Sequence, residues 1–348
     1  MKMTGIIIIV IISMFIWCIS IYNGWIKEAF IFGYGILNSW IEPDITWNDN
    51  TTTIKYGKYA YRLLNEISIP ENINTIESNA FKGNKLTNIT ISSNVKLGDN
   101  SFGSDFEGFY KNFGMKAGKY TRDYYESEDW TVWIDDYGYK NNADGITIMG
   151  YKGSDTEVVI PSEFNERKIT NIAKDAYKGK RLTKITIPAS VTYIGENAFR
   201  ENKLTNVTIP ASVTYIGDNA FRENNLTNVT IPDNVYRIDN YAFYKNQLTN
   251  ITIGKTTGVI GKYAFADNKL TRIFLPNNVK SIDVYAFKDN QITRVSIGEN
   301  VTLGSDSSVN GILGDNTGFN SAYSNNKNRA GVYTRPNAKN STWTRVPR

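Results

Sequence analysis

The segment LTNVTIPASVTYIGDNAFRENN, residues 204–225, is one copy of a pattern that returns every 22 residues along much of the chain. One copy cannot bury its own apolar face, so copies of this length are expected to stack on one another as a solenoid. The pattern therefore predicts one continuous stack of coils. The counterparts of Leu204 stand at positions 182, 226, 248, 270 and 292, and those of Ala220-Phe221 at 198–199, 242–243, 264–265 and 286–287.

Apolar and polar residues divide one copy between core and surface. Leu204, Val207 and Ile209 are expected to point inward, and the polar residues between them outward, as in a strand with one wet face. Pro210 is expected to end this strand because it has no N–H to donate. Gly217 is expected to permit a tight bend.

One asparagine stands at the same position in each copy, where the chain turns into the next strand. In residues 204–225 this residue is Asn224. A buried amide at such a position is expected to satisfy backbone groups that a curved coil leaves free. Its counterparts are Asn202, Asn246, Asn268 and Asn290.

The L-T-x-I-x-I-P strand, the I-G-x-x-A-F turn and residues 145–161 together resemble the leucine-rich repeats of the BspA type. The likeness covers most of residues 60–305, with asparagine in place of the cysteine that usually follows Ala-Phe. The resemblance implies a β-rich solenoid, a leucine-rich-repeat array with 22-residue coils. It also implies a secreted or surface-anchored binding protein, often an adhesin, which is an inference by analogy.

Composition excludes several kinds of chemistry. The chain of 348 residues has no histidine and one cysteine, Cys18, which excludes Ser-His-Asp and Cys-His catalysis, His/Cys zinc sites and internal disulfides. Carboxylates such as Glu196 and Asp218 recur with the repeat, whereas a catalytic pair belongs to one site. The net charge of +5 is modest and does not indicate a nucleic-acid partner. We therefore expect no catalytic residue, no metal site and no cofactor.

Residues 1–21 carry an apolar run that includes seven consecutive residues from Ile6 to Ile12 after a basic Lys2. Such a run predicts a signal peptide or a retained signal anchor, and either delivers the rest of the chain outside the cytoplasm. A lipoprotein signal at Cys18 fits less well, and a buried core helix is the remaining alternative. Residues 22–60 are aromatic-rich and are expected to form a membrane-proximal segment or an N-terminal cap.

The chain also contains an internal duplication. A short array, residues 61–103, is followed by an aromatic terminal element, 104–134, and the main array, 162–304, by a second such element, 305–348. Matching residues of the two elements differ by 213 in number, as Phe106 and Phe319 do. We expect both elements to cap the open end of a solenoid, with carbohydrate or peptide binding as the alternative. Residues 135–161 are expected to form a polar linker, 135–144, and an entry hairpin that pairs 146–148 with 158–160.

Departures from the repeat are where a binding site is sought. The outward strand positions carry threonine and asparagine in the middle copies, but Arg272, Phe274, Arg294 and Ser296 near the C-terminal end. An exposed aromatic residue between arginines has the chemistry of a binding hot spot, and Lys184 adds charge at the other end of the ladder. The candidate ligand-binding residues are therefore Arg272, Phe274, Arg294 and Lys184, with ordinary surface variation as the alternative.

Three functions follow from these features. The first is an extracytoplasmic binding protein of the cell surface, membrane-anchored or secreted, whose strand face contacts a host or neighbouring-cell protein or glycan. A membrane contact is expected only through the N-terminal segment, if it stays uncleaved. The second is a structural spacer or surface scaffold without a specific ligand. The third, a glycan-acting enzyme, would need a carboxylate pair outside the repeat phase.

Overall fold

The computed structural model describes residues 45, 47, 50–103, 106–112, 114–122, 130–305, 311–314 and 318–346. They fall into two compact units, unit 1 (Met1–Val132) and unit 2 (Trp133–Arg348). The predicted signal segment, residues 1–21, and the greater part of residues 22–50 lie outside the described residues. Within the described part of the chain, no helix has both the length and the apolar character that a membrane span requires.

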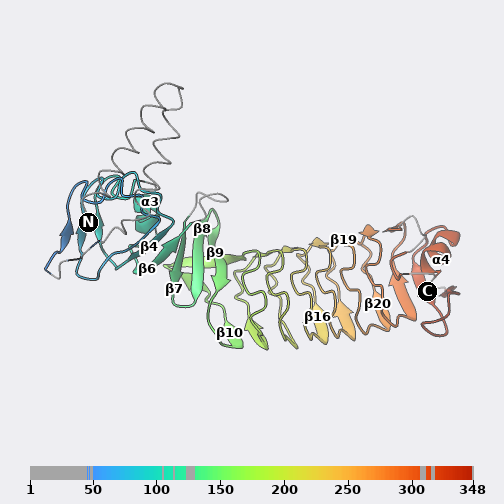
Figure 1. The fold of residues 1–348 in the computed structure, drawn as a ribbon. Helices are drawn as coiled ribbons and strands as arrows, with labels where there is room; N and C mark the ends of the chain where they lie inside the picture. The colour runs from blue at the N-terminus through green and yellow to red at the C-terminus, as the bar shows by residue number, and fades with distance from the viewer. Residues whose placement is uncertain are drawn as a thin grey trace, which may run out of the picture. The chain divides into compact units, whose positions relative to one another are not determined.

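Each coil of unit 2 has three sides. On the first side, β16 (Asn228–Thr230) pairs in parallel with β18 (Asn250–Thr252), with residues 22 apart in register. On the second side, β17 (Arg237–Ile238) lies between the parallel strands β15 (Tyr215–Ile216) and β19 (Val259–Ile260). The third side consists of turns that contain the Ala-Phe pair. The repeats are therefore successive coils of one stack, as predicted (Figure 1).

The other strands of unit 2 extend these two ladders in both directions. On the first side, the coil of Leu204 follows the same path although its residues 206–208 are not assigned as a strand, and Val207 is only half-buried. The first-side strands are β10 (Glu157–Val159), β13 (Lys184–Thr186), β16, β18, β20 (Arg272–Phe274) and β22 (Arg294–Ile297). The remaining second-side strands of the repeats are β14 (Tyr193–Ile194), β21 (Ser281–Ile282) and β23 (Thr302–Leu303).

The core of the stack is built from columns of equivalent residues. Leu204, Leu226 and Leu248 are fully buried, each above the next. The phenylalanine of each Ala-Phe pair stacks on its counterpart, and the ring centroids of Phe221 and Phe243 lie 5.3 Å apart. Burying one such side chain contributes about 1.5–3 kcal/mol. This column supplies much of the cohesion between coils, since no disulfide is available.

The repeated asparagine performs the role expected of it. Asn224 is buried, its side-chain oxygen accepts a 3.1 Å hydrogen bond from the Leu204 N–H, and its Nδ2 donates to the carbonyls of Phe199 and Phe221 at 2.9 and 3.1 Å. The same arrangement recurs in the neighbouring coils. It satisfies the N–H at the start of a strand, and each turn carbonyl receives hydrogen bonds from the asparagines of two successive coils.

The role predicted for Gly217 is wrong. Gly217 does not have a positive φ, and the left-handed residues of this turn are Asn219 (φ 58°) and Glu223 (φ 57°). A Cβ at Gly217 would instead lie 2.9 Å from the backbone nitrogen of Glu196. Glycine therefore serves the close approach of adjacent coils, and the bend itself does not depend on it, since Asp239 stands at the same position one coil later.

Both aromatic terminal elements are caps built to one plan. Each places a helix, α3 (Phe106–Asn112) or α4 (Phe319–Asn325), beneath the last coil of its array. The Tyr323 hydroxyl donates to Gly298 O at 2.8 Å and accepts from Val301 N at 3.0 Å, while Tyr110 makes the equivalent bonds to Ser92 and Val95. An antiparallel strand then pairs with the last first-side strand, which covers the open edge.

The cap strands of the two units also correspond. In unit 1, β6 (Gly118–Thr121) pairs with β4 (Asn88–Ile91). In unit 2, β24 (Gly331–Thr334) pairs with β22, and β25 (Thr344–Val346) then pairs with β24. Arg122 lies 4.8 Å from the ring centroid of Trp130, and Arg335 lies at the same distance from Trp343. The duplication read from the sequence thus holds at the level of individual contacts.

The array of unit 1 begins earlier than residue 61, where the short array was expected to start. Ile54 pairs in register with Ile76, and the Tyr59 ring stacks on Phe81 at 5.4 Å, so residues 53–59 already form part of a coil. The predicted boundary at residue 60 therefore falls inside a repeat. The strands of unit 1 outside the cap are β1 (Thr53–Ile54), β2 (Glu66–Ser68), β3 (Thr75–Ile76), β4 and β5 (Lys96–Leu97), and β7 (Thr131–Ile134) spans the boundary with unit 2.

The start of the main array differs from the prediction. Residues predicted as a linker contain β8 (Tyr137–Asn142), which forms an antiparallel hairpin with β9 (Gly145–Tyr151). The expected partner of β9, the strand β10, instead pairs in parallel with β13 and is the first rung of the first side. The polar segment predicted as a linker also contains tyrosines that stabilise the hairpin. The ring of Tyr139 stacks on that of Phe164, with the ring centroids 4.1 Å apart. The strand β12 (Arg167–Ile172) continues from β9 into the second side, and β11 (Glu163–Phe164) pairs with it.

Candidate binding surfaces

The first side of unit 2 presents two columns of outward side chains. In the middle coils these columns are asparagine and threonine, as in Asn228 and Thr230, and both residues are exposed. They alternate with buried residues such as Val229, because successive side chains of a strand point to opposite faces. The pattern makes a flat, uncharged, polar surface.

Three of the four candidate residues lie together where this pattern changes. Arg272 pairs in register with Arg294 on the neighbouring strand, and Phe274 lies two residues farther along β20. Phe274 is 67% exposed. Both arginines are exposed, and neither has a carboxylate within ion-pair distance among the residues that the structure describes.

Lys184 does not belong to this group. It lies on β13, and the coils of Asn206, Asn228 and Asn250 separate it from β20. At about 4.8 Å per strand, four steps separate these strands by roughly 19 Å. Its ammonium group also lies 3.8 Å from Glu157, its register partner on β10. Lys184 is therefore part of an exposed ion pair at the opposite end of the ladder.

The strand alternation predicts that the Ser296 side chain points outward, but only 6% of the residue's surface is exposed. In the register of the sheet it lies between Phe274 on β20 and Val332 on β24. Larger side chains therefore flank the short serine on both sides and shield it from solvent. The sequence could not show this, because β24 is distant in the chain.

The cap strands extend the surface around Phe274. Across β20, β22, β24 and β25 the register aligns one row of Phe274, Ser296, Val332 and Val346. A second row, parallel to the first, consists of Arg272, Arg294, Thr334 and Thr344. We call these eight residues the cap-side surface. It has an apolar row that ends at the exposed Val346 and a basic, hydroxyl-bearing row beside it.

Unit 1 has the same scaffold with a different surface. Its β2, β4 and β6 pair as β20, β22 and β24 do, parallel and then antiparallel. Glu66 and Asn88 stand where unit 2 has Arg272 and Arg294, and Ser68 stands in place of Phe274. The scaffold therefore does not require an aromatic residue or arginines at these positions.

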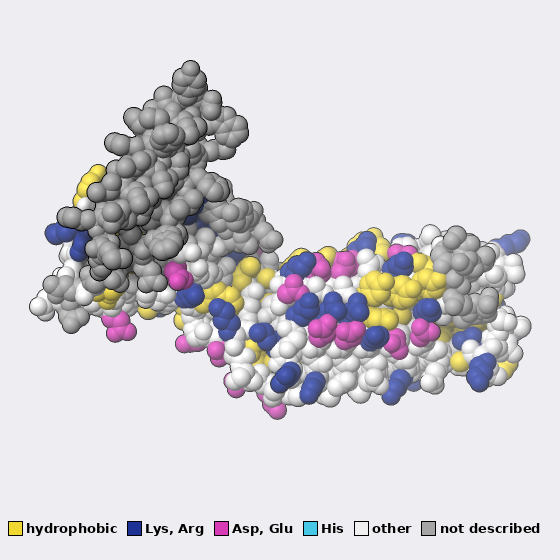
Figure 2. Space-filling view, in the orientation of Figure 1, with side chains coloured by type: hydrophobic (Ala, Val, Ile, Leu, Met, Phe, Trp, Pro, Cys, Tyr) yellow, Lys and Arg dark blue, Asp and Glu magenta, His cyan; other side chains and the backbone are white. Residues whose placement is uncertain are grey.

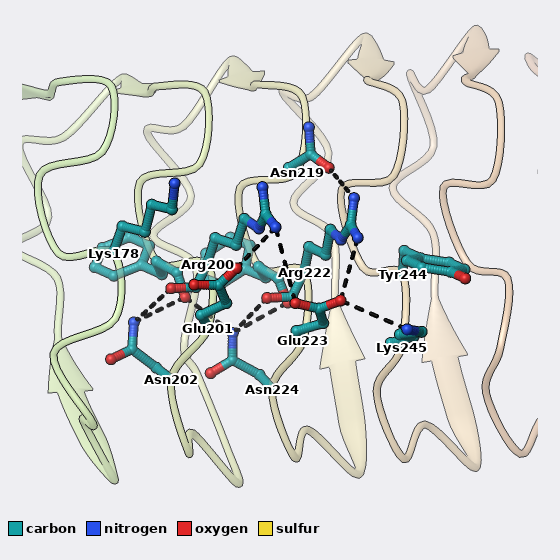
Figure 3. Close-up of polar contacts among 12 residues, drawn as sticks. Lys178, Arg200, Glu201, Asn202, Asn219, Arg222, Glu223, Asn224, Tyr244 and Lys245 are labelled. Atoms are coloured by element: carbon teal, nitrogen blue, oxygen red, sulfur yellow. Dashed lines mark hydrogen bonds and ion pairs between the residues drawn. The ribbon is translucent and has the colours of Figure 1, made fainter.

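A network of ion pairs runs along the third side of unit 2 (Figure 3). Glu223 lies 3.2 Å from Arg222, 3.6 Å from Lys245 and 3.9 Å from Arg200, and Arg200 also lies 2.7 Å from Glu201. Burial opposes the charge of Glu223, but the hydrogen bond from Arg222 and the surrounding cations hold its pKa below the ordinary value. Glu223 therefore bridges three successive coils, whereas Glu201 pairs with Arg200 beside it in the chain.

A column of tyrosines follows this network along the third side. Tyr241 and Tyr263 stack with ring centroids 4.9 Å apart, Tyr263 and Tyr285 do the same, and Tyr244 packs edge-on against Tyr241 at 5.5 Å. We call Tyr241, Tyr244, Tyr263 and Tyr285 the tyrosine column. All four are half-exposed. In Figure 2 a hydrophobic patch follows rows of charged side chains along this array. The tyrosine column is absent from the candidate residues predicted from the sequence, although the sequence shows the change from Asn219 to Tyr241 at one repeat position.

A third departure from the repeat is a buried acid on the second side. Asp239 is 6% exposed and accepts a short hydrogen bond from Arg237 Nε. A hydrogen bond with Asp239 and burial both raise the pKa of Tyr215, whose ring stacks on Tyr193 at 4.7 Å. Arg237 of the same coil neutralises the carboxylate of Asp239, so we interpret this cluster as a structural contact. Within the described part of the chain no three carboxylate, cysteine or histidine side chains gather where they could hold a metal ion.

These features define a leucine-rich-repeat solenoid whose last coils are covered by terminal elements. The family profile described as BspA type leucine rich repeat region matches residues 34–107 and 170–294, in 6 copies and over more than half of the chain. The chain belongs to this family, as its repeats predicted.

Several solved structures are similar to parts of the chain. A leucine rich cell surface protein from Faecalibacterium prausnitzii matches with 22% identity and a TM-score of 0.39, over 52% of this chain and 60% of its own. The pneumococcal vaccine antigen PcpA matches with 21% identity and a TM-score of 0.42, over 51% of this chain and 52% of its own. The chain thus spans little more than half the length of these two proteins, and we take no residue role from them. No curated protein matches the chain.

Proposed function

We propose that this chain is a non-enzymatic, surface-exposed binding protein that contacts a protein or glycan of a host or neighbouring cell through its cap-side surface. The observation that carries the proposal is Phe274, 67% exposed beside two arginines in register on a rigid sheet. Aromatic and arginine side chains dominate binding hot spots. The middle coils carry threonine at the equivalent position, so the fold does not require an aromatic residue there.

The arginine pair supports the same proposal. Like charges directly opposite on neighbouring strands are destabilising, and the middle coils avoid this with asparagine. Arg272 and Arg294 stand in register without a described carboxylate to neutralise them. A carboxylate, sulfate or phosphate group of a partner would fit between the two guanidinium groups, because arginine binds such groups with paired hydrogen bonds.

The duplication strengthens the argument. Unit 1 repeats the scaffold and has Glu66 and Ser68 at the positions of Arg272 and Phe274. If these positions served folding alone, both copies would be expected to use similar residues. The contrast favours a role for the unit 2 residues outside the fold.

The proposed location outside the cytoplasm rests on the BspA-type family and on the apolar run of residues 1–21. The proposal that the protein is not an enzyme rests on the repeated, bridging carboxylates and the lack of histidine. A surface spacer without a ligand is the alternative, and it predicts an inert cap-side surface.

The test uses the full chain on arrays of purified cell-surface and matrix proteins and of glycans. The variant R272N/F274T/R294N installs the residues that the middle coils carry, so it should fold normally. We expect it to lose at least about tenfold in affinity for the partner that the wild type binds, as removal of hot-spot residues does.

The matched control is N228A/T230A, which changes the same two columns in a middle coil. It should bind as the wild type does. A partner that binds all three proteins equally would place the contact elsewhere, and failure of the wild type to bind any arrayed molecule would favour the spacer.

A further inference from the structure

The tyrosine column occupies a backbone position that suits tyrosine poorly. Tyr241, Tyr263 and Tyr285 have φ values of 57°, 56° and 64°, in the left-handed region. Earlier coils place Asn197 and Asn219 at this position, and a short polar side chain tolerates that region best. Three consecutive coils thus replace a favourable residue with a bulky one at a cost in backbone strain. Strain of this kind is typically retained at functional sites.

We propose that the tyrosine column and its flanking lysines form a second binding surface, which takes a protein segment carrying carboxylates beside apolar or aromatic side chains. The surface lies on the third side of the coils, whereas the cap-side surface lies on the first. Binding at the tyrosine column and binding at the cap-side surface can therefore be tested independently.

The ring geometry favours a protein partner over a glycan. Tyr241, Tyr263 and Tyr285 stack on one another, with interplanar angles of 12° and 23°. Neighbouring rings therefore cover most of the ring faces on which a sugar would stack, so the accessible part of each half-buried ring is mainly its edge. Aromatic edges carry the positive part of the quadrupole, so they attract carboxylates and the ring faces of other aromatic side chains. Tyrosine surfaces of this rigid, amphipathic kind are frequent in protein recognition.

The charges around the column favour an acidic partner. Lys262 lies 5.7 Å from the ring centroid of Tyr263, and Lys288 lies 5.0 Å from that of Tyr285. Neither lysine pairs with a carboxylate of the described residues, whereas Lys245, beside Tyr244, shares Glu223 with two arginines. Asp267 and Asp289 occur in the same coils and are exposed. The partner's carboxylates are therefore expected over Lys262 and Lys288 and not along the whole column.

The experiment selects phage-displayed random peptides on the full chain, with depletion on the variant Y241N/Y263N/Y285N. Asparagine is the residue of the earlier coils, so the variant should keep its fold, and its thermal midpoint should be equal or higher. We expect an enriched consensus with aspartate or glutamate beside apolar or aromatic residues. A synthetic peptide of that consensus should bind the variant and K262Q/K288Q at least about tenfold more weakly than the wild type.

F274T is the matched control, and it should bind the peptide unchanged because Phe274 lies on the first side. Added salt should weaken binding to the wild type, since Lys262 is exposed and Lys288 is half-buried. The proposal is overturned if no peptide is enriched, if the enriched peptides lack carboxylates, or if the triple variant binds them equally. Binding of a uronate polymer in preference to the peptide would also overturn it, in favour of a glycan site.

Discussion

The side-chain oxygen of Asn246 accepts a 3.1 Å hydrogen bond from the backbone N–H of Leu226, one coil earlier in the stack. The same side chain donates to Phe221 O and Phe243 O at 3.0 and 3.1 Å. A single buried amide thus joins the turn of one coil to the strand start of another. This contact recurs wherever the asparagine recurs, and it makes the polar interior of the solenoid as periodic as its apolar core.

Replacing Asn246 with alanine is expected to lower the free energy of unfolding by about 1–3 kcal/mol, because the buried Leu226 N–H loses its partner and two carbonyls each lose one of their two donors. Urea denaturation followed by circular dichroism measures the change. The exposed Asn225 of the preceding coil provides the control, and N225A should change the free energy of unfolding by less than about 0.5 kcal/mol. Equal effects of the two substitutions would show that the buried amide has no special role.

Tyr177 occupies the phenylalanine column, and its hydroxyl is buried without a hydrogen-bond partner among the residues that the structure describes. The following coils place Phe199 and Phe221 at this position. We expect Y177F to raise the free energy of unfolding by about 1 kcal/mol, since an unsatisfied buried hydroxyl is removed and the ring stack is kept. A thermal melt measures this change. A lower melting temperature would instead mean that the hydroxyl has a bound partner such as water.

Alkaline pH should destabilise the fold through its buried tyrosines. Burial raises the pKa of Tyr139 to about 12, and it also raises the pKa of Tyr120 and Tyr177. Above about pH 10 the unfolded chain releases these protons while the folded chain retains them. The folded state then binds more protons, so the free energy of unfolding falls as pH rises. From pH 7 to 9 these tyrosines should change the free energy of unfolding very little.

The measurement is the urea midpoint as a function of pH. The variant Y139F keeps the stack on Phe164 and loses the ionisable group, so its midpoint should fall less steeply above pH 10. Identical slopes for Y139F and the wild type would contradict the assignment to Tyr139.

The C-terminal cap should depend on Arg335. This buried side chain donates from Nε to Ile292 O at 2.7 Å and from Nη1 to Asn340 O at 3.1 Å, and it stacks on Trp343. Lysine cannot reproduce the planar, forked contact. We expect R335K to lower the free energy of unfolding by about 2–3 kcal/mol.

Hydrogen exchange locates the effect of R335K, which should raise exchange rates in residues 331–346 and leave the middle coils unchanged. The exposed Arg329 takes the same substitution as a control and should show no change. Uniform loosening of the whole stack in R335K would argue against a local cap contact.

Much of the fold could be predicted from the spacing of a few residue types. Leu204, the Ala220-Phe221 pair and Asn224 recur in one phase, and a residue that returns with the coil must lie above its counterpart. The exposure of Phe274, Arg272 and Arg294 could be predicted in the same way, because they stand at outward strand positions, although Ser296 at such a position is buried. Lys184 met the same criterion, but a neighbouring strand supplied Glu157 as its partner.

The sequence alone determined the stack, its phase and its duplication, because these depend on contacts between residues at a constant separation. Tertiary structure decided what depends on segments of irregular separation or on local backbone conformation. The pairing of β24 with β22 buried Ser296 and brought Val332 and Val346 into one row with Phe274. The left-handed φ of Tyr263 was likewise seen only in the structure, although the 22-residue spacing of the tyrosines already places their rings above one another. The spacing of the repeat does not specify the register of a strand from a distant segment or the sign of φ at one residue.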